Sequence, residues 1–251
     1  MTAVAAASPS RSAVRGSRAL FAGQSWLEAR KSLSTRSGTA LVGVSALLAP
    51  VAVALVSATA DMPLTEVTGP IVISGMLSVL VLLSMGVLST AGEWTHGSVQ
   101  TTYLLEPRRS RVLAAKSVAV AAIGAAVAAV AAGLSFGVLA AMEPSASWSG
   151  AGRGVAMVAV AGAVFALIGA GVGAALGNTP AALTGVYLVN LGVMPLLQTF
   201  KPALADKIDP GNAVLDLAQA QHQAQSIVIL VAWVAVALIA GAVMTRRRAV
   251  Q

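Results

Sequence analysis

Six long apolar stretches, separated by short polar segments, dominate the chain. The hydrocarbon core of a bilayer is about 30 Å thick and needs about 20 residues of helix. None of the stretches alternates apolar and polar residues with a period of two, which disfavours a transmembrane barrel. A backbone in hydrocarbon must pair its amides within its own segment, so we predict six transmembrane helices. They cover Thr39–Ala58, Gly69–Thr90, Leu113–Ala141, Gly154–Leu176, Ala181–Thr199 and Ser226–Met244, within a membrane domain of residues 39–245.

The composition supports a membrane protein. Apolar residues make up 57% of the chain and charged residues only 10%, whereas soluble domains carry about 25% charged residues. Too few polar groups remain to cover a soluble globule, so the expected class is an all-α, polytopic membrane protein. The absence of cysteine excludes a disulfide framework, a thiolate zinc site, an iron–sulfur cluster and a cysteine nucleophile.

Thirteen of the 16 basic residues lie in three segments that share one predicted side of the membrane. Basic loops stay in the cytoplasm, so we expect both termini inside, as an even number of spans also requires. Anionic headgroups of the lipid bilayer attract such loops, which explains the net charge of +7 without nucleic acid as a partner. The segments precede the first span, separate the second from the third and follow the sixth: Arg11, Arg15, Arg18, Arg30, Lys31 and Arg36; Arg108, Arg109, Arg111 and Lys116; Arg246, Arg247 and Arg248.

The region before the first span is too polar to cross a membrane. It lacks the continuous apolar run of a signal peptide, so no cleavage is expected. Residues 1–16 have the composition of a disordered cytoplasmic tail. At the other end of the chain, residues 246–251 form a short basic tail.

Residues 17–38 have the pattern of an amphipathic helix. A narrow apolar stripe recurs at helical spacing, formed by Ala22, Trp26, Ala29 and Leu33. A basic helix with one tryptophan is typical of a segment that lies in the membrane interface. The residues expected at headgroup depth are Trp26, Glu28, Arg30 and Lys31. A helix that only anchors the first span fits the pattern as well.

The chain lacks residues that would supply its own energy or chemistry. It has no Gly-x-x-x-x-Gly-Lys-Ser/Thr segment, so it has no P-loop for ATP. Its two histidines, His96 and His222, fall on opposite predicted sides and are too few for a zinc site. No ionisable residue lies in the middle of a span, unlike in ion-coupled carriers. We therefore expect no enzyme activity, and either a partner that supplies energy or a passive role.

Polar side chains within the spans are hydroxyls and amides rather than charges. They can line a substrate cavity, or they can join helices, which is their more common use in membranes. The candidates are Ser74, Ser78, Ser84, Thr184, Tyr187 and Asn190. Gly169 and Gly173 form a Gly-x-x-x-Gly pair that allows close helix approach, which we expect within the chain.

The segment after the second span, residues 91–112, has the pattern of a short helix on the membrane face. Pro107 ends the pattern. One face of this helix carries Trp94, Ser98, Thr101 and Leu105, and the face expected toward the cytosol carries Glu93, His96 and Gln100. A helix of this kind suits docking into a groove of a partner protein. An ordinary structured loop fits the pattern equally.

This segment resembles the signature of the type-2 ABC exporter permeases, the ABC-2 type. In that family a Gly-Glu-aromatic-x-His-Gly stretch is followed by a leucine and by Pro-Arg-Arg-x-Arg-x-x-x-x-Lys. The matching residues are Gly92, Glu93, Trp94, His96, Gly97, Leu104, Pro107, Arg108, Arg109, Arg111 and Lys116. The stretch Trp26–Arg36 is a looser match to the family's amino-terminal interfacial helix, because Trp26 precedes Glu28. Gly177–Pro180 is similar to the family's turn between the fourth and fifth spans.

The resemblance implies a permease subunit of an ATP-driven exporter in a bacterial plasma membrane. Two permease subunits, identical or paralogous, would assemble with two ATPase subunits that bind Mg-ATP, so this chain would hold no cofactor itself. The ATPases would drive a coupling helix that includes Glu93, Trp94, His96, Gly97, Gln100, Thr101, Leu104 and Leu105. The third span would be anchored at its cytoplasmic end by Arg108, Arg109, Arg111 and Lys116.

Residues 200–225 match the position of the family's short re-entrant helices between the fifth and sixth spans. Pro202 and Pro210 interrupt this segment. We expect Asn212 to cap a short helix that runs through Asp216 to His222. The segment would act as an outer gate, or it would be only a folded outer loop.

Other classes of function remain open. A stand-alone secondary carrier or channel would need internal symmetry or charges within the spans, and neither is visible. A non-transporting scaffold or regulatory subunit is also compatible with the pattern. An intramembrane enzyme is the least supported, because no catalytic set is found in the spans. The uncharged spans favour a hydrophobic or amphiphilic substrate.

Overall fold

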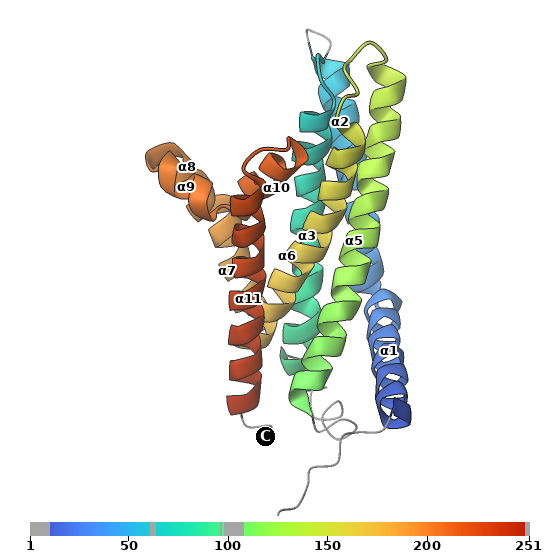
Figure 1. Cartoon of the computed structure of the whole chain (residues 1–251), viewed down its shortest axis with the longest axis vertical. Coiled ribbons are helices and arrows are strands. Elements are labelled where there is room, and N and C mark those ends of the chain that lie inside the picture. Colours follow the sequence, from blue (N-terminus) through green and yellow to red (C-terminus); the bar gives the residue numbers. More distant parts are fainter. Residues whose placement is uncertain (1–10, 61–63, 96, 98–107, 249–251) are drawn as a thin grey trace, which may run out of the picture.

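The computed structural model describes residues 11–60, 64–95, 97 and 108–248, with side chains from residue 21 onward. These residues form a bundle of helices (Figure 1). Within them, six helical segments are long and apolar enough to cross a membrane, and each contains one predicted span. They are α2 (Arg36–Thr59), α3 (Thr68–Thr95), α5 (Arg109–Met142), α6 (Ala151–Leu176), the broken segment Thr179–Phe200 and α11 (Gln223–Arg247). The prediction of an all-α protein with six spans is confirmed.

The helices α3 and α6 lie at the centre of the bundle, with α2 and α5 on one side and α11 on the other (Figure 1). In α3, 67% of the apolar window is buried inside the chain, against 22% in α2 and in α11. The outer helices therefore present most of their apolar surface outward, as expected where lipid tails replace a protein core.

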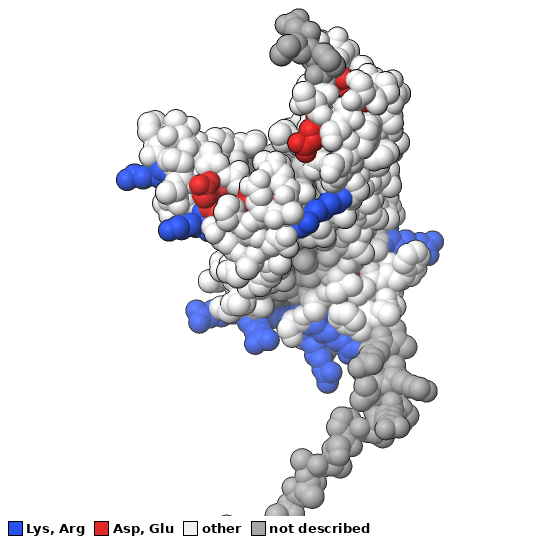
Figure 2. Space-filling view, turned by 45° about the horizontal axis from the view of Figure 1, so that its top comes forward, with Lys and Arg blue, Asp and Glu red and all other residues white. Residues whose placement is uncertain are grey.

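Basic side chains gather at one end of the bundle (Figure 2). This end, here called the basic end, holds the starts of α2 and α5 and the ends of α3, α6 and α11. Arg109, Arg246 and Arg247 belong to these helix ends. The basic residues at these helix ends therefore lie together at one end of the bundle, as the sequence predicts. That this end faces the cytosol stays a prediction.

Glycine brings α3 and α6 into backbone contact. A Cβ atom added at Gly169 would lie 2.1 Å from the carbonyl oxygen of Leu83. At Gly173 it would lie 2.4 Å from the Oγ1 atom of Thr90, whose hydroxyl donates to the Ala170 carbonyl of α6 at 2.9 Å. The Gly-x-x-x-Gly pair thus packs within the chain, as expected from its sequence.

We predict that Gly169→Ala lowers the free energy of unfolding by about 1–3 kcal/mol, because the added methyl group forces α3 and α6 apart. Gly133→Ala in α5 is the matched control, since a Cβ atom there meets nothing within 4 Å. That control should be neutral or stabilise the protein by up to about 1 kcal/mol. Unfolding by titration with SDS measures both. Equal stability of the two variants would contradict the close contact.

The fifth span is broken into three pieces and leans away from the bundle. It consists of α7 (Thr179–Tyr187), a π-helical turn η1 (Leu188–Val193) and α8 (Met194–Phe200). Pro195 lacks the N–H that a regular helix would donate to an earlier carbonyl, which accounts for a widened turn before it. α7 packs against α3 and α6. By contrast, α8 packs chiefly against η1 and the next helix, α9 (Pro202–Ile208), and both project from the bundle (Figure 1).

A short turn joins α6 to α7 at Gly177–Pro180, the segment that resembles the family's turn between the fourth and fifth spans. Gly177 ends α6 in the left-handed conformation with φ of 56°, which glycine adopts without strain. The side chain of Asn178 then accepts a hydrogen bond from the Ala181 N–H at 2.9 Å and caps α7. Pro180 stands in the first turn of α7, where its missing N–H costs nothing.

Two short helices, α9 (Pro202–Ile208) and α10 (Pro210–Ala218), occupy the segment between the fifth and sixth spans. The cap of α10 is Asp209, which accepts from the Gly211 N–H at 2.7 Å, and the prediction of Asn212 as the cap is wrong. The helix also ends at Ala218 rather than at His222, which is the left-handed residue before α11. Sequence favoured Asn212 because aspartate and asparagine cap equally well, and only the backbone decides between them.

Asp209 provides a pH-dependent test of this loop. Burial raises the pKa of Asp209, although backbone hydrogen bonds from Gly211 and Asn212 oppose the rise. The stabilising contribution of a group with a raised folded-state pKa is complete below its unfolded pKa and is lost as the pH rises through the folded value. Asp209→Asn keeps the cap without the charge, so it should stabilise the protein at pH 7.

This gain should vanish in acid, below the ordinary aspartate pKa of about 3.9. Asp209→Ala removes the cap as well as the charge, so it should be about 1 kcal/mol less stable than Asp209→Asn at every pH. Thermal unfolding in detergent at both pH values measures the two effects. A pH-independent gain for Asp209→Asn would show that its charge is not the cause.

The helix α1 (Arg11–Ser34) begins six residues before the predicted interfacial helix and ends four residues before its predicted end. Thr35 separates it from α2, and its side chain accepts from the Gly38 N–H at 3.1 Å. α1 lies beside α5 at the basic end (Figure 1). Ala29 packs against the core, whereas Trp26 is 69% exposed. The predicted single stripe of Trp26 and Ala29 is therefore split between two faces.

Candidate functional site

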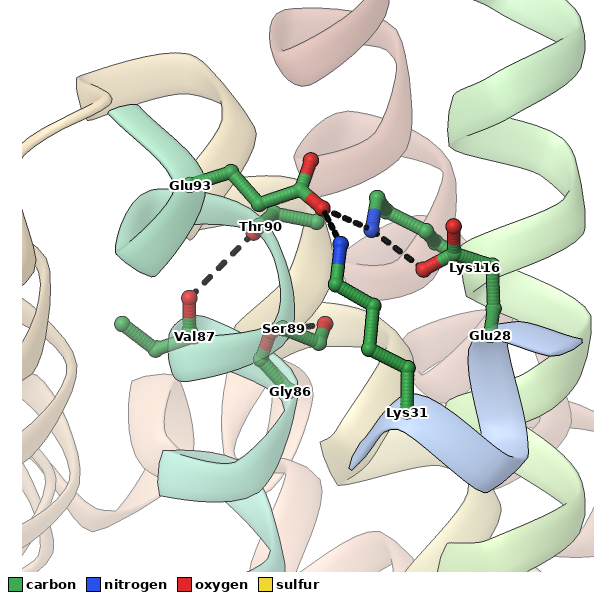
Figure 3. A network of polar contacts seen from close by, with 8 residues as sticks. All are labelled: Glu28, Lys31, Gly86, Val87, Ser89, Thr90, Glu93 and Lys116. Carbon is green, nitrogen blue, oxygen red and sulfur yellow. Dashed lines mark hydrogen bonds and ion pairs between the residues drawn. The ribbon is translucent and has the colours of Figure 1, made fainter. Parts of the chain in front are cut away.

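Four charged side chains from three helices form a network at the basic end (Figure 3). Lys116 in the second turn of α5 donates to Glu93 in the last turn of α3 at 2.9 Å. Lys116 also donates to Glu28 of α1, and Lys31 of α1 donates to Glu93. Glu28 and Lys31 are three residues apart and therefore share one face of α1. The network joins α1, α3 and α5, with two carboxylates for two ammonium groups.

Most of this network is removed from solvent. The exposed fraction of the side chain is 6% for Lys116 and 10% for Glu93, but 51% for Lys31. Buried charges are tolerated when they are paired and hydrogen-bonded, and both conditions hold for Lys116 and Glu93. Burial alone would oppose the ammonium of Lys31, but the hydrogen bond and charge of Glu93 outweigh it and raise the pKa of Lys31.

The expectation that Glu93 faces the cytosol is wrong. The helix α3 continues through Thr95, so Glu93 still lies within the packed helix rather than on a separate surface helix. Lys116 and Lys31 meet its carboxylate from α5 and α1. Sequence held one signal of this arrangement, because Glu28 and Glu93 are among the few acidic residues beside thirteen basic ones.

A cavity of about 230 Å³ adjoins the network. Its walls come from α1, α2, α3 and α5 and combine charged, hydroxyl and apolar side chains. The residues that enclose it are Glu28, Lys31, Ser32, Thr35, Ser37, Gly38, Leu41, Met85, Leu88, Ser89, Gly92, Glu93 and Lys116. Sequence reasoning missed this cavity, because it lies where α1 turns onto the bundle and no single segment encodes it.

A second set of contacts ties the helix ends together. The guanidinium of Arg248 donates to the carbonyls of Ala175 and Leu176 at 2.8 and 2.9 Å, and so satisfies the open end of α6. It also lies 5.0 Å from the centre of the Trp94 ring, within the range of a cation–π contact. Arg109 donates to the Thr245 carbonyl at 3.0 Å. Arg248 was predicted only as one of the basic residues of the tail after the sixth span.

The segment predicted as a coupling helix falls largely outside the described residues. His96, Gln100, Thr101, Leu104 and Leu105 belong to that part. Gly97 follows α3 with φ of 70°, a conformation that favours glycine. Thr95 accepts from the Thr179 N–H at 3.2 Å, which links the start of the segment to α7. Its far flank is the start of α5, where Arg108, Arg109 and Arg111 precede the network's Lys116.

The six polar residues proposed for a cavity in the spans do not act as one group. Ser78 accepts from the Ala49 N–H of α2 at 3.1 Å, just before the helix-interrupting Pro50. Tyr187 hydrogen-bonds to Ser84 and donates to the Leu80 carbonyl at 3.1 Å, which joins α7 to α3. Ser74 and Asn190 bond to carbonyls of their own span, and the side chain of Thr184 is exposed. Helix contacts thus account for Ser78 and Tyr187.

Comparison with known proteins adds no assignment: no family model matches the chain, and no curated protein does. The geometry alone therefore describes what the site can do. Glu93 lies on α3, which precedes the segment of residues 96–107, and Lys116 lies on α5, which follows it. The ammonium of Lys116 donates a hydrogen bond to the Glu93 carboxylate. A displacement of that segment would pass directly to α1 through Lys31 and Glu28.

Proposed function

We propose that this chain is the membrane-spanning permease subunit of an ATP-driven exporter of the ABC-2 type. The observation that carries the proposal is the attachment of both flanks of residues 96–107 to α1 through one buried charge network. A coupling element needs such rigid attachment to pass a push into the membrane helices. The signature residues from Gly92 to Lys116 supply the family resemblance.

In this proposal the basic end faces the cytosol, and two permease chains meet two ATPase subunits there. Closure of the ATPases on Mg-ATP moves the coupling segment, and the Glu93–Lys116 pair moves α3, α5 and α1 as one body. The substrate is hydrophobic or amphiphilic and leaves on the opposite side. ATP can shift the equilibrium between the two states only by its different affinity for them, and the ATPases provide that difference.

Copurification tests the proposal directly. The tagged chain, expressed with its neighbouring genes and solubilised in mild detergent, should retain a protein with a P-loop ATPase motif. A variant with Arg108, Arg109 and Arg111 replaced by glutamine should retain less of this ATPase, because these cations flank the coupling segment. A carrier or scaffold that works alone would bring down no ATPase, and that result would refute the proposal.

The orientation is tested separately, and the lack of cysteine makes this simple. Thr95→Cys and Ser145→Cys each introduce one exposed thiol, at the basic end and in the opposite loop. A membrane-impermeant maleimide should label Ser145→Cys in intact cells and Thr95→Cys only after permeabilisation. The reverse pattern would place the coupling segment outside and exclude any contact with a cytosolic ATPase.

A further inference from the structure

A smaller cavity at the basic end shares Glu93 and Lys116 with the cavity beside α1. Its volume is about 20 Å³, and its other walls come from α3, α5, α6 and α11 rather than from α1 and α2. All the residues that line it are buried except Trp94, which is partly buried. The cavity therefore lies inside the bundle, against the Glu93–Lys116 pair.

One wall of this small cavity is Thr245, in the last turn of α11. A threonine within a helix often donates to the carbonyl four residues earlier. Thr245 is only 4% exposed, yet its Oγ1 atom has no hydrogen-bond partner among the described residues. A buried hydroxyl without a partner costs free energy, so we looked for a partner across the cavity. Four other threonines of the chain do bond back to their own helix: Thr39, Thr59, Thr95 and Thr199.

The opposite walls of the small cavity supply donors and acceptors. Lys116 uses two of its three N–H donors on the two carboxylates of the network, and the third has no partner among the described residues. The Glu93 carboxylate lies beside it, with Thr90 one turn earlier on α3 (Figure 3). Each carboxylate oxygen accepts more than one hydrogen bond, and the Thr90 hydroxyl, which donates to a carbonyl of α6, can still accept one.

We propose that the small cavity binds one water molecule, which joins Thr245 of α11 to the charge network. The water accepts from the third N–H of Lys116 and from the Thr245 hydroxyl, and it donates to the Glu93 carboxylate and to Oγ1 of Thr90. A buried water needs about 10–15 Å³ of such volume and two to four polar partners, and the cavity meets both conditions. Through this water α11 becomes the fourth helix of the network. The site does not depend on the transport proposal.

The charges around the small cavity select water over an ion. A metal cation would meet the ammonium of Lys116, and an anion would meet the carboxylate of Glu93. These two charges already balance each other, so an added ion would stay uncompensated in a buried place. A neutral molecule that both donates and accepts satisfies the ammonium, the carboxylate and the hydroxyl together, and the volume admits only one as small as water.

A structure of the unaltered, full-length protein in lipid nanodiscs, at a resolution that shows ordered water, tests the site directly. We expect a density peak at about 3 Å from both Oγ1 of Thr245 and Nζ of Lys116, the ordinary length of a hydrogen bond. Absence of this peak, or a Thr245 hydroxyl turned back onto the Gly241 carbonyl, would overturn the proposal. This comparison uses no variant, so misfolding cannot confuse it.

A double-mutant cycle measures whether the hydroxyl acts on the network. Thr245→Val keeps the shape of the side chain without its hydroxyl and should lower the folding equilibrium constant about fivefold, the size expected for one lost hydrogen bond. In the Lys116→Met background, which lacks the ammonium that donates to the water, the same replacement should lower it about twofold or less. Titration with SDS measures all four proteins.

Thr59→Val is the matched control for this cycle, because the Thr59 hydroxyl bonds to its own helix at the opposite end. Its effect should be the same with and without Lys116. An effect of Thr245→Val that is likewise equal in the two backgrounds would show that the hydroxyl acts without the network, and would overturn the water link.

Discussion

Lys116→Met should lower the free energy of unfolding by about 3–5 kcal/mol, the cost of removing one partner from a buried ion pair. Lys116 is only 6% exposed at its side chain and holds both Glu28 and Glu93. Without it, two carboxylates lie close together and Lys31 alone remains of the network's two ammonium groups.

The same network predicts an asymmetry. Glu93→Gln should cost less, about 1–2 kcal/mol, because Lys116 keeps Glu28 and the half-exposed Lys31 can turn to solvent. Lys201→Met, an exposed lysine at the opposite end, is the matched control and should be within about 0.5 kcal/mol of the native protein. Titration with SDS, followed by circular dichroism, measures all three.

Acid should reduce the deficit of Lys116→Met, because a protonated carboxyl needs no counter-ion. The effect should become visible as the pH approaches about 4, near the ordinary pKa of glutamate. A deficit that stays constant with pH, or that is smaller than the deficit of Glu93→Gln, would mean that Lys116 stabilises the fold by packing rather than by charge.

The spans could be predicted from sequence because each one depends on a local property. A window of about 20 residues contains both the hydrophobic length and the charges at its ends. The Gly177–Pro180 turn was equally local, since Gly177 and Asn178 act on residues within one turn. All six predicted ranges lie inside helical segments of the structure.

What could not be predicted is which face of a helix meets which partner. Glu28 and Lys116 are 88 residues apart in the chain, and no local pattern links them. Trp26 and Ala29 share a stripe by spacing, yet only Ala29 packs against the core. Basic residues are expected in a cytoplasmic tail in any case, so the sequence around Arg248 does not indicate its contact with Trp94.

Sequence and structure contribute different parts of the description of this site. The signature around Glu93 located the region of interest, whereas the structure changed the role of Glu93 itself from a surface contact to an internal link. In the proposed exporter, contact with the ATPase therefore falls to the segment beyond Thr95 rather than to the Glu93 carboxylate. Substitutions at Glu93 consequently test transmission within the chain and not recognition of a partner.

Glu93→Lys should abolish coupled transport while the chain still inserts and folds its spans. Three ammonium groups would then meet Glu28 alone, and α1 would separate from the end of α3. In the reconstituted complex we expect ATP hydrolysis to continue and substrate export to fall to background. Glu66→Lys makes the same charge change at an exposed position of the opposite end and should leave both rates unchanged.

A charge swap separates loss of pairing from mere damage at this position. Lys31→Glu combined with Glu93→Lys restores the α1–α3 pair, because the new carboxylate on α1 faces the new ammonium on α3, and Glu28 stays bound to Lys116. The swap replaces the α3–α5 pair by two neighbouring ammonium groups, so it tests the α1–α3 link alone. If the network transmits motion through its charges, the double variant should recover export that neither single variant supports. Recovery would also require α1 to dock again, which limited proteolysis of α1 reports independently. Should the double variant dock α1 and still fail to export, the α1–α3 pair would be structural, and transmission would run through the Glu93–Lys116 pair of α3 and α5, which the swap removes.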